Sequence, residues 1–282
     1  MTEANILQDP TKLPSVNDSV TPVIELPKTK TLTLFNRIYG QNEVLDGQYR
    51  LYQKVLGELI GTTLFVFGVC GCNVYYGTVP VNAMLGASFM GGVIIYIFGR
   101  VSGAHFNPSV SLGLFLRNKL TSVEFILYVV AQIVGGFIGC IFLALCRRGK
   151  FKEMGGNQIQ DYLIYTAGGT ERNAWCYISA LICEILMTFI LIMFILASCE
   201  RDNYLGPTLG LGFSTTVISL SVIGGNISGC SLNPARSIAP AVIQVIAGGD
   251  KNPIKQIWIY IVGPLVGSAI AAFVWPIFVY HF

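Results

Sequence analysis

Two short stretches of this chain carry asparagine, proline and small residues where side-chain hydrogen bonds could handle a small polar solute. They are Ser102-Gly-Ala-His-Phe-Asn-Pro-Ser109 and Ser228-Gly-Cys-Ser-Leu-Asn-Pro-Ala235. A proline at the first helical position has its φ already set and no N–H to lose, so Asn107-Pro108 and Asn233-Pro234 each predict a helix start. The apolar runs that follow are too short to cross a membrane. Half-length helices in an apolar chain are typical of pores and transport sites.

The spacing of these residues indicates an internal repeat. Asn107 and Asn233 are 126 residues apart, and so are Glu58 and Glu184, each of which has a threonine four residues later. A repeat of this length decides the fold, because the chain must then consist of two copies of one unit. Three spans and one half-helix per copy place the two copies in opposite orientations, so the half-helices enter from opposite faces.

The predicted chemistry at the two helix starts is donation to a passing oxygen. Each half-helix brings roughly half a positive charge to its N-terminal end. This charge would repel cations. Asn107 and Asn233 can add side-chain N–H donors there, which would orient a passing water so that it cannot relay a proton to the next water. The alternative is that both asparagines only cap helix ends. Glu58 and Glu184 are carboxylates in apolar spans, where a charge is costly, so we expect a structural or functional role for them.

Six apolar segments are predicted to span a membrane, with the half-helices between the second and third segment of each copy. They cover about 51–76, 83–101, 123–145, 174–199, 207–224 and 257–280. We divide the chain into an N-terminal tail (1–46), which is predicted to be flexible, and a channel domain (47–282). Within that domain, repeat one covers about 50–146 and repeat two about 174–282. The predicted fold class is an all-α membrane protein with an inverted repeat.

Composition excludes several classes of protein. Of the 282 residues, 53% are hydrophobic and 12% are charged, about half the usual charged share of a soluble protein. The mean hydropathy of +0.62 agrees with a multi-pass membrane protein. The net charge of +3 gives no reason to expect a nucleic-acid partner, and with two histidines in the chain we expect no metal site and no cofactor. No nucleophile, base and orienting residue occur together, so we do not expect an enzyme.

With these motifs in hand, the sequence resembles the aquaporins, the major intrinsic protein family. The resemblance rests on the pore motifs Asn107-Pro108-Ser109 and Asn233-Pro234-Ala235-Arg236, and on Glu58-Leu-Ile-Gly-Thr-Thr-Leu-Phe65 in the first span. It implies a homotetramer with one pore per subunit. It also implies a cytosolic N-terminus, which the positive-inside rule alone does not decide for this chain. It also implies that Glu58 and Glu184 anchor the re-entrant loops. His105 is expected to bond the loop backbone and to line the pore.

The resemblance also implies a selectivity filter. Arg236 is expected at the narrowest point, and counting back from the motifs places Ala87, Ser221 and Cys230 beside it. Strict water channels usually carry phenylalanine and histidine at the first two of these positions, so this pore would be wider. Ser237 nevertheless matches the water-selective branch, where glycerol-conducting relatives carry aspartate. We therefore expect a passive water channel that excludes protons and ions.

Two alternatives to a water channel stay open. One is a broader channel for small neutral solutes such as glycerol, urea, ammonia or hydrogen peroxide, and the other is a closed-pore scaffold or adhesion protein. The sequence leaves the plasma membrane and an internal vesicle membrane both possible. Gating is expected from the N-terminal tail with Tyr39, from Tyr204 in the 200–205 loop, or from a modification at Ser122.

Overall fold

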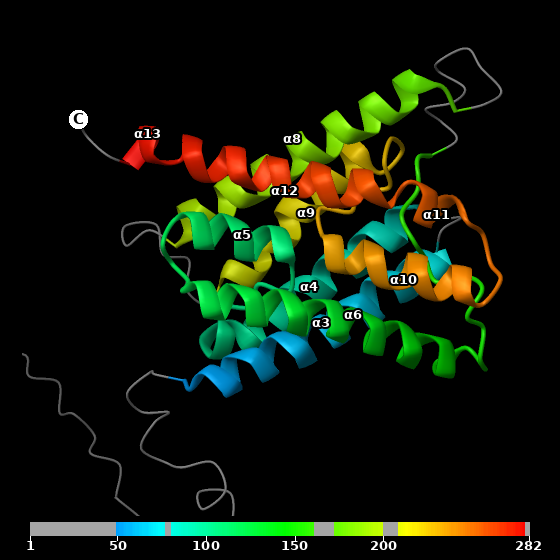
Figure 1. Ribbon diagram of the computed structural model, residues 1–282, viewed down its shortest axis with the longest axis horizontal. Helices are drawn as coiled ribbons and strands as arrows, with labels where there is room; N and C mark the ends of the chain where they lie inside the picture. The colour runs from blue at the N-terminus through cyan, green and yellow to red at the C-terminus, as the bar shows by residue number, and fades with distance from the viewer. Residues whose placement is uncertain (1–48, 77–79, 161–171, 200–207, 280–282) are drawn as a thin grey trace, which may run out of the picture. The chain divides into compact units, whose positions relative to one another are not determined.

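The computed structural model describes residues 49–76, 80–160, 172–199 and 208–279, and residues 46–282 form one compact unit (Figure 1). The long helices are α3 (Leu51–Tyr76), α4 (Pro80–Ser102), α6 (Ser122–Cys146), α8 (Ala174–Ser198), α9 (Leu209–Gly224) and α12 (Ile257–Val274). The short ones are α5 (Pro108–Leu116), α10 (Pro234–Ile246), α11 (Asn252–Lys255) and α13 (Pro276–Val279). The tail, with Tyr39, and the 200–205 loop, with Tyr204, lie outside the described residues.

The long helices confirm the predicted membrane-spanning segments. Five of the described helices are long and apolar enough to cross a membrane. The sixth, α9, has 16 described residues and follows directly on residues outside the described ranges. The predicted last span reaches about Tyr280, but the structure divides it into α12 and α13. Pro276 has no N–H to continue the hydrogen-bond ladder, so the helix is interrupted there.

The two copies pack as predicted for an inverted repeat. In the first copy α3 packs against α4 and α6, and in the second α8 packs against α9 and α12. The contact between α4 and α9 joins the two copies. Each half-helix packs chiefly against the third long helix of the other copy, α5 against α12 and α10 against α6. Figure 1 shows α5 and α10 between the long helices, in opposite halves of the unit.

Glycines allow the closest helix contacts. A Cβ on Gly135 or Gly139 of α6 would collide with the backbone of α3 at Leu59 and Thr63. In the second copy, a Cβ on Gly267 of α12 would collide with the backbone of α8 at Ile185 in the same way. Small residues let helices approach closely where lipid gives no hydrophobic driving force between them. These contacts set the distance between the first and third helix of each copy.

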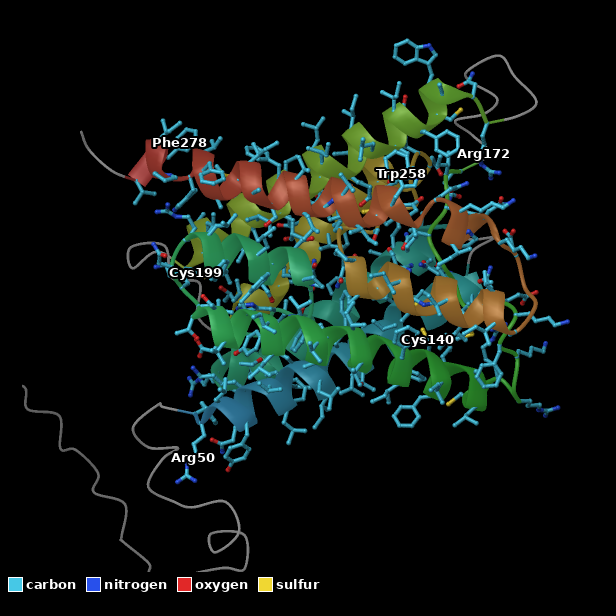
Figure 2. The ribbon with its side chains drawn as sticks, in the orientation of Figure 1. Arg50, Cys140, Arg172, Cys199, Trp258 and Phe278 are labelled. Atoms are coloured by element: carbon cyan, nitrogen blue, oxygen red, sulfur yellow. The ribbon has the colours of Figure 1, made fainter. Side chains whose placement is uncertain are left out.

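The outward faces of the long helices are apolar. Large apolar side chains are exposed along each of them; Trp258 on α12 and Phe278 on α13, labelled in Figure 2, are 42% and 67% exposed. Exposed apolar surface on this scale requires lipid or another protein to cover it.

We predict that Gly139→Ala destabilises the protein by about 1–3 kcal/mol, the usual cost of an added methyl group in a closely packed interior. The matched control is Gly99→Ala in α4, where a Cβ meets nothing within 4 Å. The control should keep its stability or gain slightly, because alanine is the better helix former. Thermal unfolding in detergent, followed by tryptophan fluorescence, measures both. Equal unfolding temperatures for the two variants would contradict the assigned contact.

Candidate functional site

Both half-helices begin at the predicted asparagine and proline. Asn107 caps α5, because its side-chain Oδ1 accepts a hydrogen bond from the Ser109 N–H at 2.8 Å. Asn233 caps α10 by accepting from the N–H groups of Ala235 at 3.0 Å and Arg236 at 3.3 Å. The prolines occupy the first helical position, where a missing N–H costs nothing. The residue pattern therefore explains the local structure at both helix starts.

The two asparagines also hold the half-helices against each other. Asn107 Nδ2 donates to the carbonyl of Leu232 at 2.8 Å, and Asn233 Nδ2 donates to the carbonyl of Phe106, also at 2.8 Å. Each side-chain amide has two N–H donors, so each asparagine keeps a second donor after this crossed contact. The arrangement brings two residues 126 positions apart into one site.

Buried carboxylates fix the loops that precede the half-helices. Glu58 accepts from the Ser102 hydroxyl at 2.6 Å and from the N–H groups of His105 at 2.9 Å and Phe106 at 2.7 Å. Glu184 accepts in the same way in the second copy, from the Ser228 hydroxyl and from the N–H groups of Ser231 and Leu232 at 2.6–2.9 Å. Both carboxylates are fully buried. Each therefore pairs backbone donors that have no other acceptor inside a bilayer.

These loops have a backbone that the carboxylates must hold in place. Non-glycine residues with positive φ occur at matching positions of the two loops, Ala104 and Phe106 in one and Cys230 and Leu232 in the other. A left-handed conformation costs an ordinary residue roughly 1–2 kcal/mol. The hydrogen bonds to Glu58 and Glu184 offset this cost.

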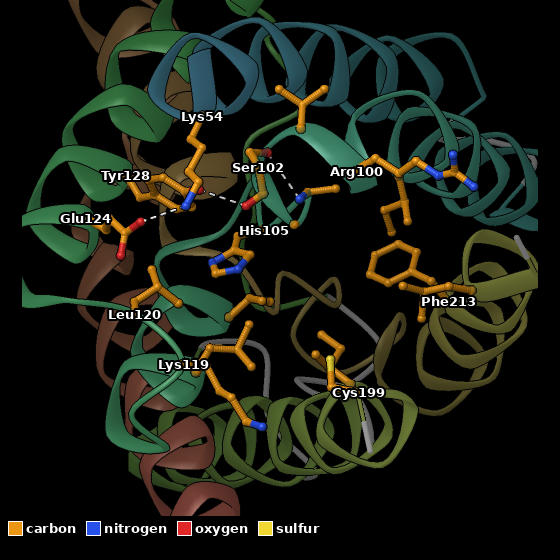
Figure 3. Close-up of a pocket in the computed structure, with 18 of the residues that line it drawn as sticks. Lys54, Arg100, Ser102, His105, Lys119, Leu120, Glu124, Tyr128, Cys199 and Phe213 are labelled. Atoms are coloured by element: carbon orange, nitrogen blue, oxygen red, sulfur yellow. Dashed lines mark hydrogen bonds and ion pairs between the residues drawn. The ribbon is translucent and has the colours of Figure 1, made fainter. Parts of the chain in front are cut away.

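Three cavities follow one another through the protein. The first, about 610 Å³, is lined by His105, Tyr128, Cys199 and Phe213 among others, and we call it the His105 cavity (Figure 3). The central cavity, about 50 Å³, contains the two asparagines. The third, about 570 Å³, is called the Ser221 cavity. Neighbouring cavities share lining residues, Ile95, Ala104, His105, Val110 and Phe213 for the first two and Phe65, Phe213, Val217 and Cys230 for the last two.

Three of the four expected filter residues line the Ser221 cavity, and the fourth, Arg236, does not. Ala87, Ser221 and Cys230 line it, and the Ser221 hydroxyl lies 3.6 Å from the Cys230 sulfur. Arg236 is 2% exposed, and its Nη1 donates to the carbonyl of Gly155, which lines the same cavity. The arginine thus lies next to the cavity and is held by the segment between the two copies.

His105 lines the His105 cavity and the central cavity. Among the described residues, its ring makes no hydrogen bond to the loop backbone, which differs from the prediction. Instead, Nδ1 lies 3.1 Å from the hydroxyl of Ser111 in α5. The ring also stands edge-on to Tyr128, whose hydroxyl donates to the carbonyl of Ser102 at 2.8 Å.

Two further residues contribute to the site and were missed in the sequence. Gln132 of α6 donates to Glu58, and Asn157 donates to the carbonyl of Gly229 while accepting from the Ser237 hydroxyl. A glutamine inside an apolar span is a signal that could have identified Gln132. Asn157 lies in a polar connecting segment and carries no such signal.

The remaining candidate, Ser122, is exposed at the start of α6. Its neighbours Leu120 and Glu124 line the His105 cavity. Thr121 caps α6 and forms a reciprocal capping box with Glu124.

Comparison with known proteins agrees with this geometry. Residues 47–275 match the family model described as major intrinsic protein. The chain belongs to this family. The chain is therefore an aquaporin-type channel and a multi-pass integral membrane protein, and not an enzyme.

Two relatives and one solved structure illustrate the similarity. A probable aquaporin NIP4-2 of Arabidopsis thaliana is 34% identical over 233 residues, covering 80% of this chain and 74% of the relative. Nodulin-26 of Glycine max is 30% identical over 232 residues, covering 80% of this chain and 77% of the relative. The X-ray structure of the aquaglyceroporin from Plasmodium falciparum matches with a TM-score of 0.70 at 21% identity, covering 82% of this aquaporin-type chain and 97% of that one. This last match shows the fold.

We predict that Glu184→Gln lowers the stability of this channel by about 1–3 kcal/mol for each buried donor left unpaired. An amide presents its own N–H₂ to a backbone N–H, so one loop bond is replaced by a repulsive contact. The control is Glu153→Gln, whose side chain is 78% exposed in its ion pair with Arg147. Thermal unfolding and water permeability in vesicles should both fall for Glu184→Gln alone. Wild-type values for Glu184→Gln would show that the carboxylate is not the anchor.

Proposed function

We propose that this channel conducts water passively and excludes protons and ions. The observation that carries the proposal is the central cavity, which is lined by both asparagines and shares lining residues with a larger cavity on each side. Its volume of about 50 Å³ holds only a few waters, because one water needs roughly 10–15 Å³ of such space. Solute must therefore pass the asparagines nearly in single file.

Electrostatics supports ion exclusion at the same place. The N-terminal ends of α5 and α10 meet there, and each carries roughly half a positive charge. The asparagines keep one side-chain N–H each for a passing oxygen. A water that accepts from both donors presents its own protons outward, which opposes proton relay through the centre.

A second candidate function is a broader channel for small neutral solutes. It is favoured by the small side chains of Ala87, Ser221 and Cys230 at the Ser221 cavity. The Ser221 hydroxyl and the Cys230 thiol, whose oxygen and sulfur are 3.6 Å apart, could form hydrogen bonds with a polyol or urea as well as with water.

Assembly and orientation belong to the same proposal. We infer a homotetramer from family membership and from the apolar outward faces of the long helices. A cytosolic N-terminus would open the His105 cavity to the cytosol, because this cavity is lined by Tyr49 and Lys54 at the start of the described chain. The membrane would be the plasma membrane or an internal vesicle membrane.

Stopped-flow measurement of water, glycerol and urea entry into vesicles tests the proposal. We predict fast water entry and much slower glycerol entry for the wild type. Ala87→Phe should reduce glycerol and urea entry more than water entry, because it narrows the Ser221 cavity. The control is Ile223→Phe on the exposed face of α9. Glycerol entry as fast as water entry would favour the broader channel, and the absence of any entry would favour a closed-pore scaffold.

Mercury block provides a further prediction. A mercurial bound at Cys230 would obstruct the pore, because this thiol lines both the central and the Ser221 cavity. Water entry should therefore be inhibited in the wild type and resistant in Cys230→Ser. Cys183→Ser and Cys199→Ser are the controls and should stay sensitive; Cys199 is exposed and lines the His105 cavity. Inhibition that persists in Cys230→Ser would place the reactive thiol elsewhere.

A further inference from the structure

A buried chain of polar side chains connects Glu58 to His105. Gln132 Nε2 donates to Glu58 Oε2 at 2.8 Å and to the Ser111 hydroxyl oxygen at 2.9 Å. That oxygen lies 3.1 Å from His105 Nδ1. Gln132 and Ser111 are fully buried, so no bulk water takes part in these contacts. The direction of each hydrogen bond in this chain therefore depends only on which of these side chains has a proton to donate.

Glu58 sets the direction of donation at one end of this chain. Its two oxygens already accept from two backbone N–H groups and one hydroxyl. Gln132 faces Glu58 Oε2 with its N–H₂ group, the orientation that suits an ionised carboxylate, which has no proton to donate. The second proton on the same nitrogen then points to Ser111.

Ser111 passes this direction on to His105. Its hydroxyl accepts from Gln132 and has one proton of its own, which points to His105 Nδ1 at the other contact. Nδ1 is then an acceptor, and a neutral imidazole with an accepting Nδ1 carries its proton on Nε2. Within the described ranges no residue bonds Nε2. Figure 3 shows the ring of His105 directed into the His105 cavity, while Arg100 points away from it.

The second copy lacks this arrangement. Ser231 and Ser237 stand where the first copy has His105 and Ser111, and their hydroxyls bond each other. Tyr128 and Tyr260 occupy equivalent positions, because their hydroxyls donate to the equivalent loop carbonyls of Ser102 and Ser228. Four residues after each tyrosine stand Gln132 and Pro264, and proline has no side-chain donor. Asn157 from the connecting segment bonds Ser237 instead. Among the described residues, a glutamine bonded to the loop carboxylate and a ring beside it therefore occur in the first copy only.

We propose that Gln132 is a positioning residue that, through Ser111, holds His105 in the tautomer with its proton on Nε2. The pore then has one fixed N–H donor on the His105 side, directed at solute oxygens before they reach the asparagines. What this donor does for a solute rests on the proposed function, but the tautomer itself does not.

The opposite direction of donation is chemically possible and can be measured. If Glu58 carried a proton, it could donate to Gln132 Oε1, and Ser111 would donate to the same oxygen. His105 Nδ1–H would then donate to Ser111, which leaves Nε2 without a proton. The two states differ in the protonated ring nitrogen, which ¹⁵N chemical shifts report directly.

The experiment is solid-state NMR at neutral pH on full-length, ¹⁵N-histidine-labelled protein in lipid vesicles. The chain has two histidines, so His281→Ala leaves the signal of His105 alone. We expect a protonated Nε2 and an unprotonated Nδ1 in this background. In Gln132→Met, Ser111 is free to accept from Nδ1, and the ratio of the two tautomers should shift by about fivefold or more, the effect of one hydrogen bond of ordinary net strength. The matched control is Gln244→Met, a buried glutamine of α10 that bonds Met154 N–H.

A protonated Nδ1 in the unsubstituted network, with or without a protonated Nε2, would overturn the proposal. An unchanged tautomer ratio in Gln132→Met would overturn it as well. Should Gln132→Met not fold, Ser111→Ala removes the donor to Nδ1 and should produce the same shift. Water entry into the same vesicles is measured in parallel, so failure of transport and failure of the tautomer assignment are told apart.

Discussion

The structure depends on two buried carboxylates that pair the backbone of two loops inside the membrane. A loop that re-enters a bilayer has no water to satisfy its N–H groups, and each unpaired group costs several kcal/mol. Glu58 and Glu184 each accept two backbone N–H groups and one serine hydroxyl. The loops keep a strained backbone at matching positions because these bonds hold it. The meeting of the half-helices follows from this anchoring.

The duplication is close in the backbone and incomplete in the side chains. The anchoring glutamate, the loop and the capping asparagine repeat at the same spacing. The additional polar residue that bonds them differs: Gln132 bonds Glu58 in the first copy, and Asn157 bonds Ser237 in the second. The segment that supplies Asn157 is held by apolar side chains as well as polar ones. Met154 is buried in a cluster formed mainly by α3 and α6, and Ile159 in a cluster formed by α8 and α12. This segment also supplies the carbonyl that holds Arg236, so the two ends of the pore are built from different elements.

Much of the fold could be predicted because its signals are local. Long apolar runs set the spans to within a few residues, and Asn-Pro pairs set the starts of α5 and α10. The predicted last span is confirmed in length, but the apolar run gave no warning that the helix is interrupted at Pro276, where a backbone donor is missing. The side-chain partner of His105 was mistaken. It depends on Ser111, six residues along the chain, which the turn into α5 brings within reach of the ring.

The sequence by itself determined the repeat, the helix starts, the intramembrane carboxylates and the family, since each is carried by residue type and spacing along one chain. Only the tertiary structure decided that each asparagine donates to the loop of the other copy, that Arg236 is held by Gly155, and that Gln132 connects Glu58 to Ser111. These contacts join residues 21 to 127 positions apart. Spacing along a chain cannot specify such pairs, because hydrogen bonds depend on distances of about 3 Å that packing alone establishes.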